Sequence, residues 1–89
     1  MIDIDIVWNR IKQHEGEVFH LLQGDELCYS IQGERLTHNR TQWPLYKRSF
    51  EEAIRQVPLS NPEAVGKTIR GGSYIFAILM DERVRGADW

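Results

Sequence analysis

The chain has 89 residues, of which 42 % are hydrophobic and 27 % charged, a composition typical of one folded domain and not of a disordered segment. Its formal net charge is −2, and its longest apolar run, residues 74–80, is far shorter than the roughly 20 residues that a membrane-crossing helix requires. The lone Cys28 excludes an internal disulfide and a cysteine zinc site. We therefore expect a single compact domain, residues 1–89, in the cytoplasm and not at a membrane.

The first predicted element is an amphipathic helix over about residues 4–14. Apolar side chains recur there at the spacing i, i+3, i+4, i+7 that marks one face of a helix: Ile4, Val7, Trp8 and Ile11. Asp3 is placed to cap the start of this helix, and Gly16 to follow its end.

Three short runs follow, over residues 17–22, 27–32 and 35–40, with turn residues between them. The middle run alternates between apolar and polar side chains, which places Leu27, Tyr29 and Ile31 on one face. Leu36 is the apolar position of the third run. Alternating runs joined by short glycine-containing turns predict a three-stranded antiparallel meander with one buried face.

Helices are predicted for the second half of the chain. Ser49 and Glu52 have the spacing of a capping box, which begins a helix whose apolar stripe ends at Val57, before Pro58. A short helical turn is expected to start at Asn61-Pro62 and to end at Gly66. Residues 73–85 suit either a buried helix or a buried strand, and we favour the helix. The predicted fold is α+β, in the order α-β-β-β-α-α-α, with the meander packed against the N-terminal and C-terminal helices.

Two patterns suggest chemistry but have simpler explanations. The motif His14-Glu15-Gly16-Glu17, followed by His20, contains metal-binding side chains, yet Gly16 separates the two histidines and solvated polar residues are the better interpretation. Cys28 lacks the glycine-rich elbow of a nucleophile, although His14, His20 and His38 are candidate bases, and a lone cysteine usually packs as a small hydrophobic side chain. We predict no metal site and no catalytic residue.

Two further features are weaker. Arg70-Gly71-Gly72-Ser73 resembles neither a phosphate loop nor a dinucleotide fingerprint in its spacing, so a simple turn is favoured over an anion site. The adjacent acidic pairs at residues 51–52 and 81–82 do not point at a common centre on a helix. We therefore expect no cofactor and a protein that is not an enzyme.

The best functional candidate is a basic stretch over residues 35–48. The segment carries a formal charge of +4, against −5 for residues 1–34 and −1 for residues 51–89. Arginine and lysine neutralise phosphates, asparagine and glutamine pair with base edges, and aromatic rings stack on bases. The predicted nucleic-acid-binding residues are Arg35, His38, Asn39, Arg40, Gln42, Trp43, Tyr46, Lys47 and Arg48.

A solvated edge strand with its loop explains the same residues, and the acidic overall charge is atypical of nucleic-acid-binding domains. We therefore also keep a homodimeric or protein-binding role without nucleic acid as the alternative. A homodimer is expected because a chain of this length has a small core and surplus aromatic surface at Trp43 and Trp89.

Four segments resemble stretches of small uncharacterised bacterial proteins, some of them carried on mobile elements. These segments are Trp8-x-Arg10-Ile11-x-x-His14-Glu15-Gly16-Glu17-x-Phe19, Arg40-Thr41, Ser49-Phe50-Glu51-x-Ala53 and Arg70-Gly71-x-Ser73-Tyr74-Ile75-x-Ala77-Ile78-Leu79. The resemblance spans most of the chain and implies no activity, ligand or site residue.

Overall fold

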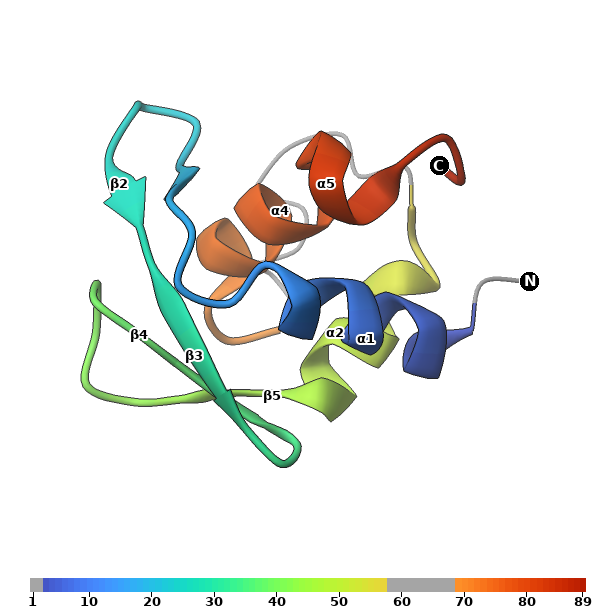
Figure 1. The fold of residues 1–89 in the computed structure, drawn as a ribbon, viewed down its shortest axis with the longest axis horizontal. Helices are drawn as coiled ribbons and strands as arrows, with labels where there is room; N and C mark the ends of the chain where they lie inside the picture. Colours follow the sequence, from blue (N-terminus) through green and yellow to red (C-terminus); the bar gives the residue numbers. More distant parts are fainter. Residues whose placement is uncertain (1–2, 58–68) are drawn as a thin grey trace.

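The computed structural model describes residues 3–57 and 69–89. In chain order its elements are α1 (Ile4–Gln13), β1 (Phe19–His20), β2 (Glu26–Leu27), β3 (Tyr29–Gln32), β4 (Arg35–His38), β5 (Leu45–Tyr46), α2 (Lys47–Ile54), α4 (Gly72–Leu79) and α5 (Glu82–Arg85). The predicted α+β class, with an antiparallel sheet packed against N-terminal and C-terminal helices, is confirmed (Figure 1). Helix α2 ends at Ile54, earlier than the end expected at Pro58. The helical turn expected from Asn61-Pro62 to Gly66 lies outside the described residues.

The three-stranded sheet has the order β3-β4-β5, and β1 pairs with β2 in a separate small sheet. This corrects the predicted meander, because residues 17–22 do not belong to the larger sheet and β5 supplies its third strand. The run 27–32 is divided at Cys28. The cause is Asn39, whose side-chain oxygen accepts the Cys28 N–H at 3.0 Å while its own backbone N–H donates to the Cys28 carbonyl at 3.1 Å.

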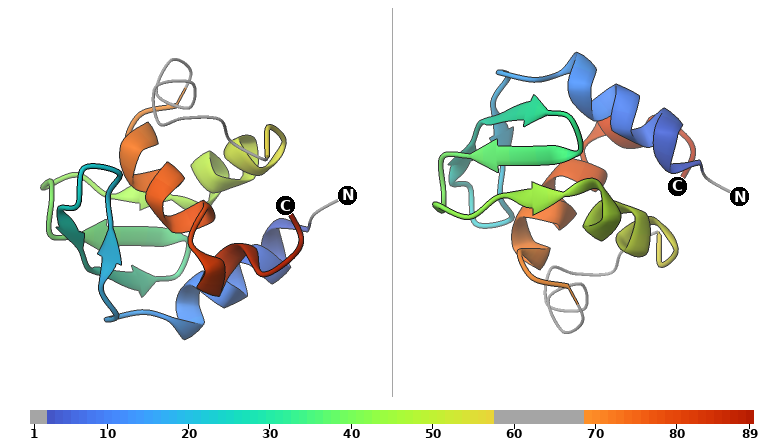
Figure 2. Two further views of the ribbon diagram at one scale, coloured as in Figure 1. Left: turned by 90° about the horizontal axis from the view of Figure 1, so that it is seen from above. Right: turned by 90° about the horizontal axis from the view of Figure 1, so that it is seen from below.

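The larger sheet has one covered face and one open face. Tyr29, Leu36 and Leu45 are buried on the covered face, and Figure 2 shows α4 behind the three strands when viewed from below. The predicted inward positions of Leu27, Tyr29 and Leu36 are confirmed. We call the opposite side the open face. Its side chains are exposed: Ser30, Gln32, Arg35, Thr37 and Tyr46.

The first and last helices agree with the prediction from the sequence, except that the last one is divided in two. Asp3 caps α1 by accepting the Asp5 N–H at 2.8 Å, as predicted. The favoured helix over 73–85 is confirmed as helical but is interrupted at Asp81. This residue has an extended backbone and accepts the Arg83 N–H at 2.9 Å, so it caps a new short helix, α5.

The capping box at Ser49 is wrong. Helix α2 begins at Lys47, directly after β5, and Tyr46 occupies the cap position without a side-chain hydrogen bond. The Lys47 N–H donates to the Glu34 carbonyl at 2.9 Å, so the strand pairing continues to the first helical residue. This pairing starts the helix two residues before Ser49, which lies inside its first turn.

The core draws apolar side chains from every element of the fold. Val7, Trp8 and Ile11 of α1 are buried against residues such as Phe19 and Phe50. Within residues 3–57 and 69–89, no polar or charged residue is fully buried. None of the helices in these ranges has the length and hydropathy needed to span a bilayer.

Candidate functional site

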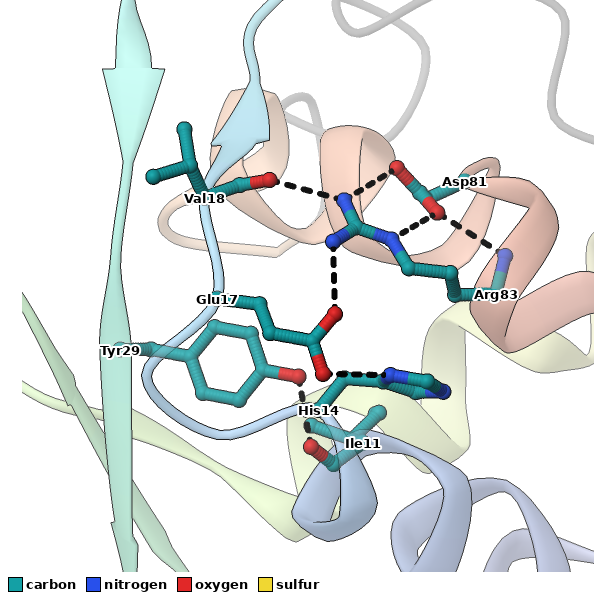
Figure 3. A network of polar contacts seen from close by, with 7 residues as sticks. All are labelled: Ile11, His14, Glu17, Val18, Tyr29, Asp81 and Arg83. Carbon is teal, nitrogen blue, oxygen red and sulfur yellow. Dashed lines mark hydrogen bonds and ion pairs between the residues drawn. The ribbon is translucent and has the colours of Figure 1, made fainter.

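One cluster of charged residues joins α1, β1 and α5 through Arg83 (Figure 3). The Arg83 guanidinium donates to both carboxylate oxygens of Asp81 at 2.9 and 3.0 Å, and to Glu17 at 3.0 Å. It also donates to the Val18 carbonyl at 2.9 Å and lies 3.8 Å from the centre of the Phe19 ring. The guanidinium hydrogen bonds lower the pKa of Asp81 and raise that of Arg83. We call these residues, with His14, the Arg83 network.

The motif His14-Glu15-Gly16-Glu17 is part of the structural framework around this network. His14 Nδ1 lies 2.9 Å from Glu17 Oε2, and this bond, together with Arg83, lowers the pKa of Glu17. Glu15 accepts the Ile31 N–H at 2.6 Å, and the Gly16 N–H donates to the Tyr29 carbonyl at 3.0 Å, so both lie along the outer edge of β3. The described residues contain no group of three metal-ligating side chains.

The histidine and asparagine at the end of β4 hold the following loop. His38 Nδ1 accepts the Arg40 N–H at 3.2 Å, so Nε2 carries the hydrogen of the neutral ring and faces Thr41 Oγ1 at 3.1 Å. The Thr41 hydroxyl in turn donates to the Trp43 carbonyl at 3.1 Å. Burial, together with the charge of Arg40, lowers the pKa of His38. Both ring nitrogens are therefore engaged within the loop and not with Cys28.

Two of the four cations of the basic stretch are paired with acids. Arg40 lies 3.5 Å from Asp25, and Lys47 Nζ lies 2.6 Å from Asp5 and 3.8 Å from Glu34. The hydrogen bond to Asp5 raises the pKa of Lys47. The amide of Asn39 is also occupied, since it donates to the Glu26 carbonyl and accepts from Cys28. Arg40, Lys47 and Asn39 therefore contribute to the fold, and the positive charges of Arg40 and Lys47 are largely balanced.

The remaining residues gather around β5. Arg35 is the cross-strand partner of Tyr46, whose side chain is 49 % exposed on the open face. Arg48 follows in the first turn of α2. Trp43, just before β5, is 43 % exposed, and the Arg70 guanidinium carbon lies 4.5 Å from the centre of its ring.

We call this set of residues the β5 patch: Arg35, Trp43, Tyr46, Arg48 and Arg70. Its three arginines make no ion pair with any residue of the described ranges. The patch includes four of the nine predicted residues. Gln42 is exposed nearby, whereas His38, Asn39, Arg40 and Lys47 are engaged elsewhere.

Arg70 is the patch residue that sequence reasoning placed in another role, as part of a possible anion-binding turn. Its position depends on Gly71, which has a φ of +81° and occupies the N-cap position of α4. A Cβ atom at Gly71 would lie 2.5 Å from Leu45 Cδ2, so only glycine allows the chain to pass this close to β5 and to place Arg70 over Trp43. No local sequence pattern predicts this long-range contact between Arg70 and Trp43.

Comparison of the chain with protein-family models, curated proteins and solved structures finds no match in any of the three. Its function is therefore argued from the geometry of the β5 patch.

Proposed function

We propose that this domain is a non-catalytic binding module that holds single-stranded nucleic acid on the β5 patch. One observation carries the proposal. One half-exposed aromatic ring belongs to the edge strand β5 and another lies just before it, and each lies beside an arginine: Tyr46 with Arg35, and Trp43 with Arg70.

This pairing of groups matches the two chemical parts of a nucleotide. Aromatic rings stack on bases regardless of sequence, and arginines neutralise phosphates. A guanidinium that stacks on an indole keeps its in-plane N–H groups available for a phosphate. Arg70 therefore supplies a preorganised donor set next to Trp43.

Arg48 supports the proposal because its positive charge does not stabilise the helix in which it lies. It lies in the first turn of α2, which contains no acid, and a cation at the positive end of a helix dipole is destabilising. Arg48 makes no ion pair with any residue of the described ranges, so no contact seen there offsets this cost. An approaching phosphate would be attracted both by this arginine and by the helix end.

Single strands fit the patch better than a duplex does. Tyr46 and Trp43 present ring surfaces for stacking, and the bases of a duplex are already stacked on one another. The carboxylates of Asp5 and Glu34 beside Lys47 border the patch and repel phosphates, which restricts the path of the strand.

One residue considered for catalysis supports the non-catalytic part of the proposal. His38, a candidate base for Cys28, uses both ring nitrogens to hold its own loop. It therefore has no free ring nitrogen placed to activate Cys28 or to act on a substrate.

A fluorescence titration of labelled oligonucleotides at 50 and 200 mM salt tests the proposal. Three arginines predict a log–log salt slope of about −2.1 for single strands. Replacing Arg48 with Gln should reduce the slope by about 0.7, whereas Lys12→Gln, an exposed cation on α1, should leave it unchanged. Absence of binding to single strands at 50 mM salt and tens of micromolar protein would contradict the proposal. A concentration-dependent mass in sedimentation would then favour the homodimeric alternative.

A further inference from the structure

A shallow depression lies beside the β5 patch, where β3 and β4 pair. It is lined in part by Gly16, Cys28, Ser30, Thr37 and Asn39. Ser30 and Thr37 are cross-strand partners on the open face, so their Cβ atoms are about 4.5 to 5.5 Å apart. Both side chains are exposed, and neither hydroxyl makes a hydrogen bond to another residue in the described part of the chain. Two neighbouring hydroxyl groups are therefore available to a ligand.

The depression continues the surface that begins at the patch. Gln32, Arg35 and Tyr46 form one row across the three strands. Ser30 and Thr37 form the next row, two residues along the strands, a step of about 7 Å. A strand of nucleic acid that stacks on Tyr46 and contacts Arg35 would therefore reach the two hydroxyls with an adjacent nucleotide.

The chemistry of the depression selects among nucleic acids. The lining residues of the described chain carry no carboxylate, and their polar groups are hydroxyl, thiol, amide and imidazole groups. The Asn39 amide, the His38 ring and the Tyr29 hydroxyl are already occupied. Serine and threonine hydroxyls both donate and accept hydrogen bonds. The ribose 2′-hydroxyl does the same, and DNA lacks it.

We infer, on the basis of the proposed function, that the bound strand is RNA and that Ser30 and Thr37 bind a ribose 2′-hydroxyl. Glu15 limits the site on the far side, because its carboxylate lies at the β3 edge, where it accepts the Ile31 N–H. The bound RNA therefore crosses the sheet from β5 and ends at β3.

The test compares RNA and DNA oligonucleotides that contain only adenine and cytosine, so that the bases are identical and the sugars alone differ. At 50 mM salt we expect RNA to bind about tenfold more tightly, the effect of one to two net hydrogen bonds. The double variant Ser30→Ala/Thr37→Val should lower RNA affinity to that of DNA and leave DNA affinity unchanged. Ser73→Ala, which removes an exposed hydroxyl at the start of α4, is the control and should preserve the difference.

Cys28 provides a second measurement on the unaltered protein. It is the only cysteine in the sequence and lines the depression, so bound RNA should slow its alkylation by iodoacetamide, and bound DNA should do so less. Equal affinities for RNA and DNA, or equal protection of Cys28 by both, would overturn the RNA inference and leave the proposed function intact. Failure of both oligonucleotides to bind would remove the proposed function as well.

Discussion

The Arg83 network and the β5 patch both contain exposed or half-exposed arginines, yet the surroundings of these arginines differ. The Arg83 guanidinium donates to two carboxylates and a carbonyl and lies over a buried phenylalanine. In the β5 patch, Arg35 and Arg70 lie beside half-exposed aromatic rings, and no acid in the described ranges pairs with them.

This difference separates the structural use of Arg83 from the binding that we propose for the arginines of the β5 patch. Arg83 ties α5 to the segment between α1 and β1, which is distant in sequence, and its hydrogen-bonding capacity is largely satisfied inside the molecule. The arginines of the β5 patch make no ion pair within the described ranges, and in our proposal their donors bind a partner outside the molecule. The comparison predicts that equivalent substitutions in the two regions will have opposite consequences, with stability affected in one and binding in the other.

The largest effect is expected beside the Arg83 network, at Tyr29. This side chain is 2 % exposed, and its hydroxyl donates to the Ile11 carbonyl at 2.5 Å. Tyr29→Ala should lower the free energy of unfolding by about 3 to 5 kcal/mol through the cavity it leaves. Tyr29→Phe removes the hydrogen bond alone and should cost about 1 kcal/mol. Urea denaturation measures both, and equal losses for the two variants would show that packing of the ring contributes little.

A smaller loss is expected when Arg83 is replaced with Gln. The substitution removes the ion pairs to Asp81 and Glu17 and the bond to the Val18 carbonyl. Since the side chain is 32 % exposed, solvent screening limits the expected cost to about 1 to 2 kcal/mol. Thermal and urea melts give the value. A variant as stable as the parent would place Arg83 in the same class as the arginines of the β5 patch.

His38 predicts a pH dependence in the loop that leads to the β5 patch. Its pKa is lowered in the folded protein by burial and by Arg40, so folding favours the neutral ring. This stability is fully present above the unfolded pKa of about 6.5 and is lost as the pH falls through that value towards the folded pKa. The contribution to the slope is at most about 1.4 kcal/mol per pH unit. Urea melts between pH 5 and 8 should show a shallower dependence for His38→Gln, and an unchanged profile would contradict the assignment.

The smallest effect on stability is expected at Arg48, the counterpart of Arg83. Arg48→Gln should change the free energy of unfolding by less than about 0.5 kcal/mol, and in the stabilising direction, because a cation leaves the positive end of α2. The same variant should weaken binding of single strands. A loss of stability comparable to that of Arg83→Gln would show that Arg48 contributes to the fold.

Local patterns were sufficient to predict the elements that depend on local interactions. The cap at Asp3, the apolar face of α1 and the inward positions of Leu27, Tyr29 and Leu36 follow from spacing alone. β5 was missed because two residues within a basic segment give no periodic signal. The capping pattern at Ser49 was misleading for the same reason, since the unrecognised strand determines where α2 begins.

The sequence indicated the region of the candidate site but not all of the residues that form it. The basic stretch contains Arg35, Tyr46 and Arg48, but charge counts cannot show that Asp5 and Asp25 pair with Lys47 and Arg40. Nor can they show that Arg70 crosses to Trp43. Each of these contacts joins residues far apart in the sequence and depends on tertiary packing.

The contacts of Glu15 and Gly16 along β3 have a consequence for aggregation. An edge strand offers free backbone groups to which another chain can add a strand of its own. Here the Tyr29 carbonyl and the Ile31 N–H are already satisfied, and at the opposite edge Pro44, which has no N–H, precedes the two-residue β5. A second chain gains no new hydrogen bond at these two β3 positions unless it first displaces Glu15 and Gly16, so the sheet is protected there from growing into intermolecular fibres.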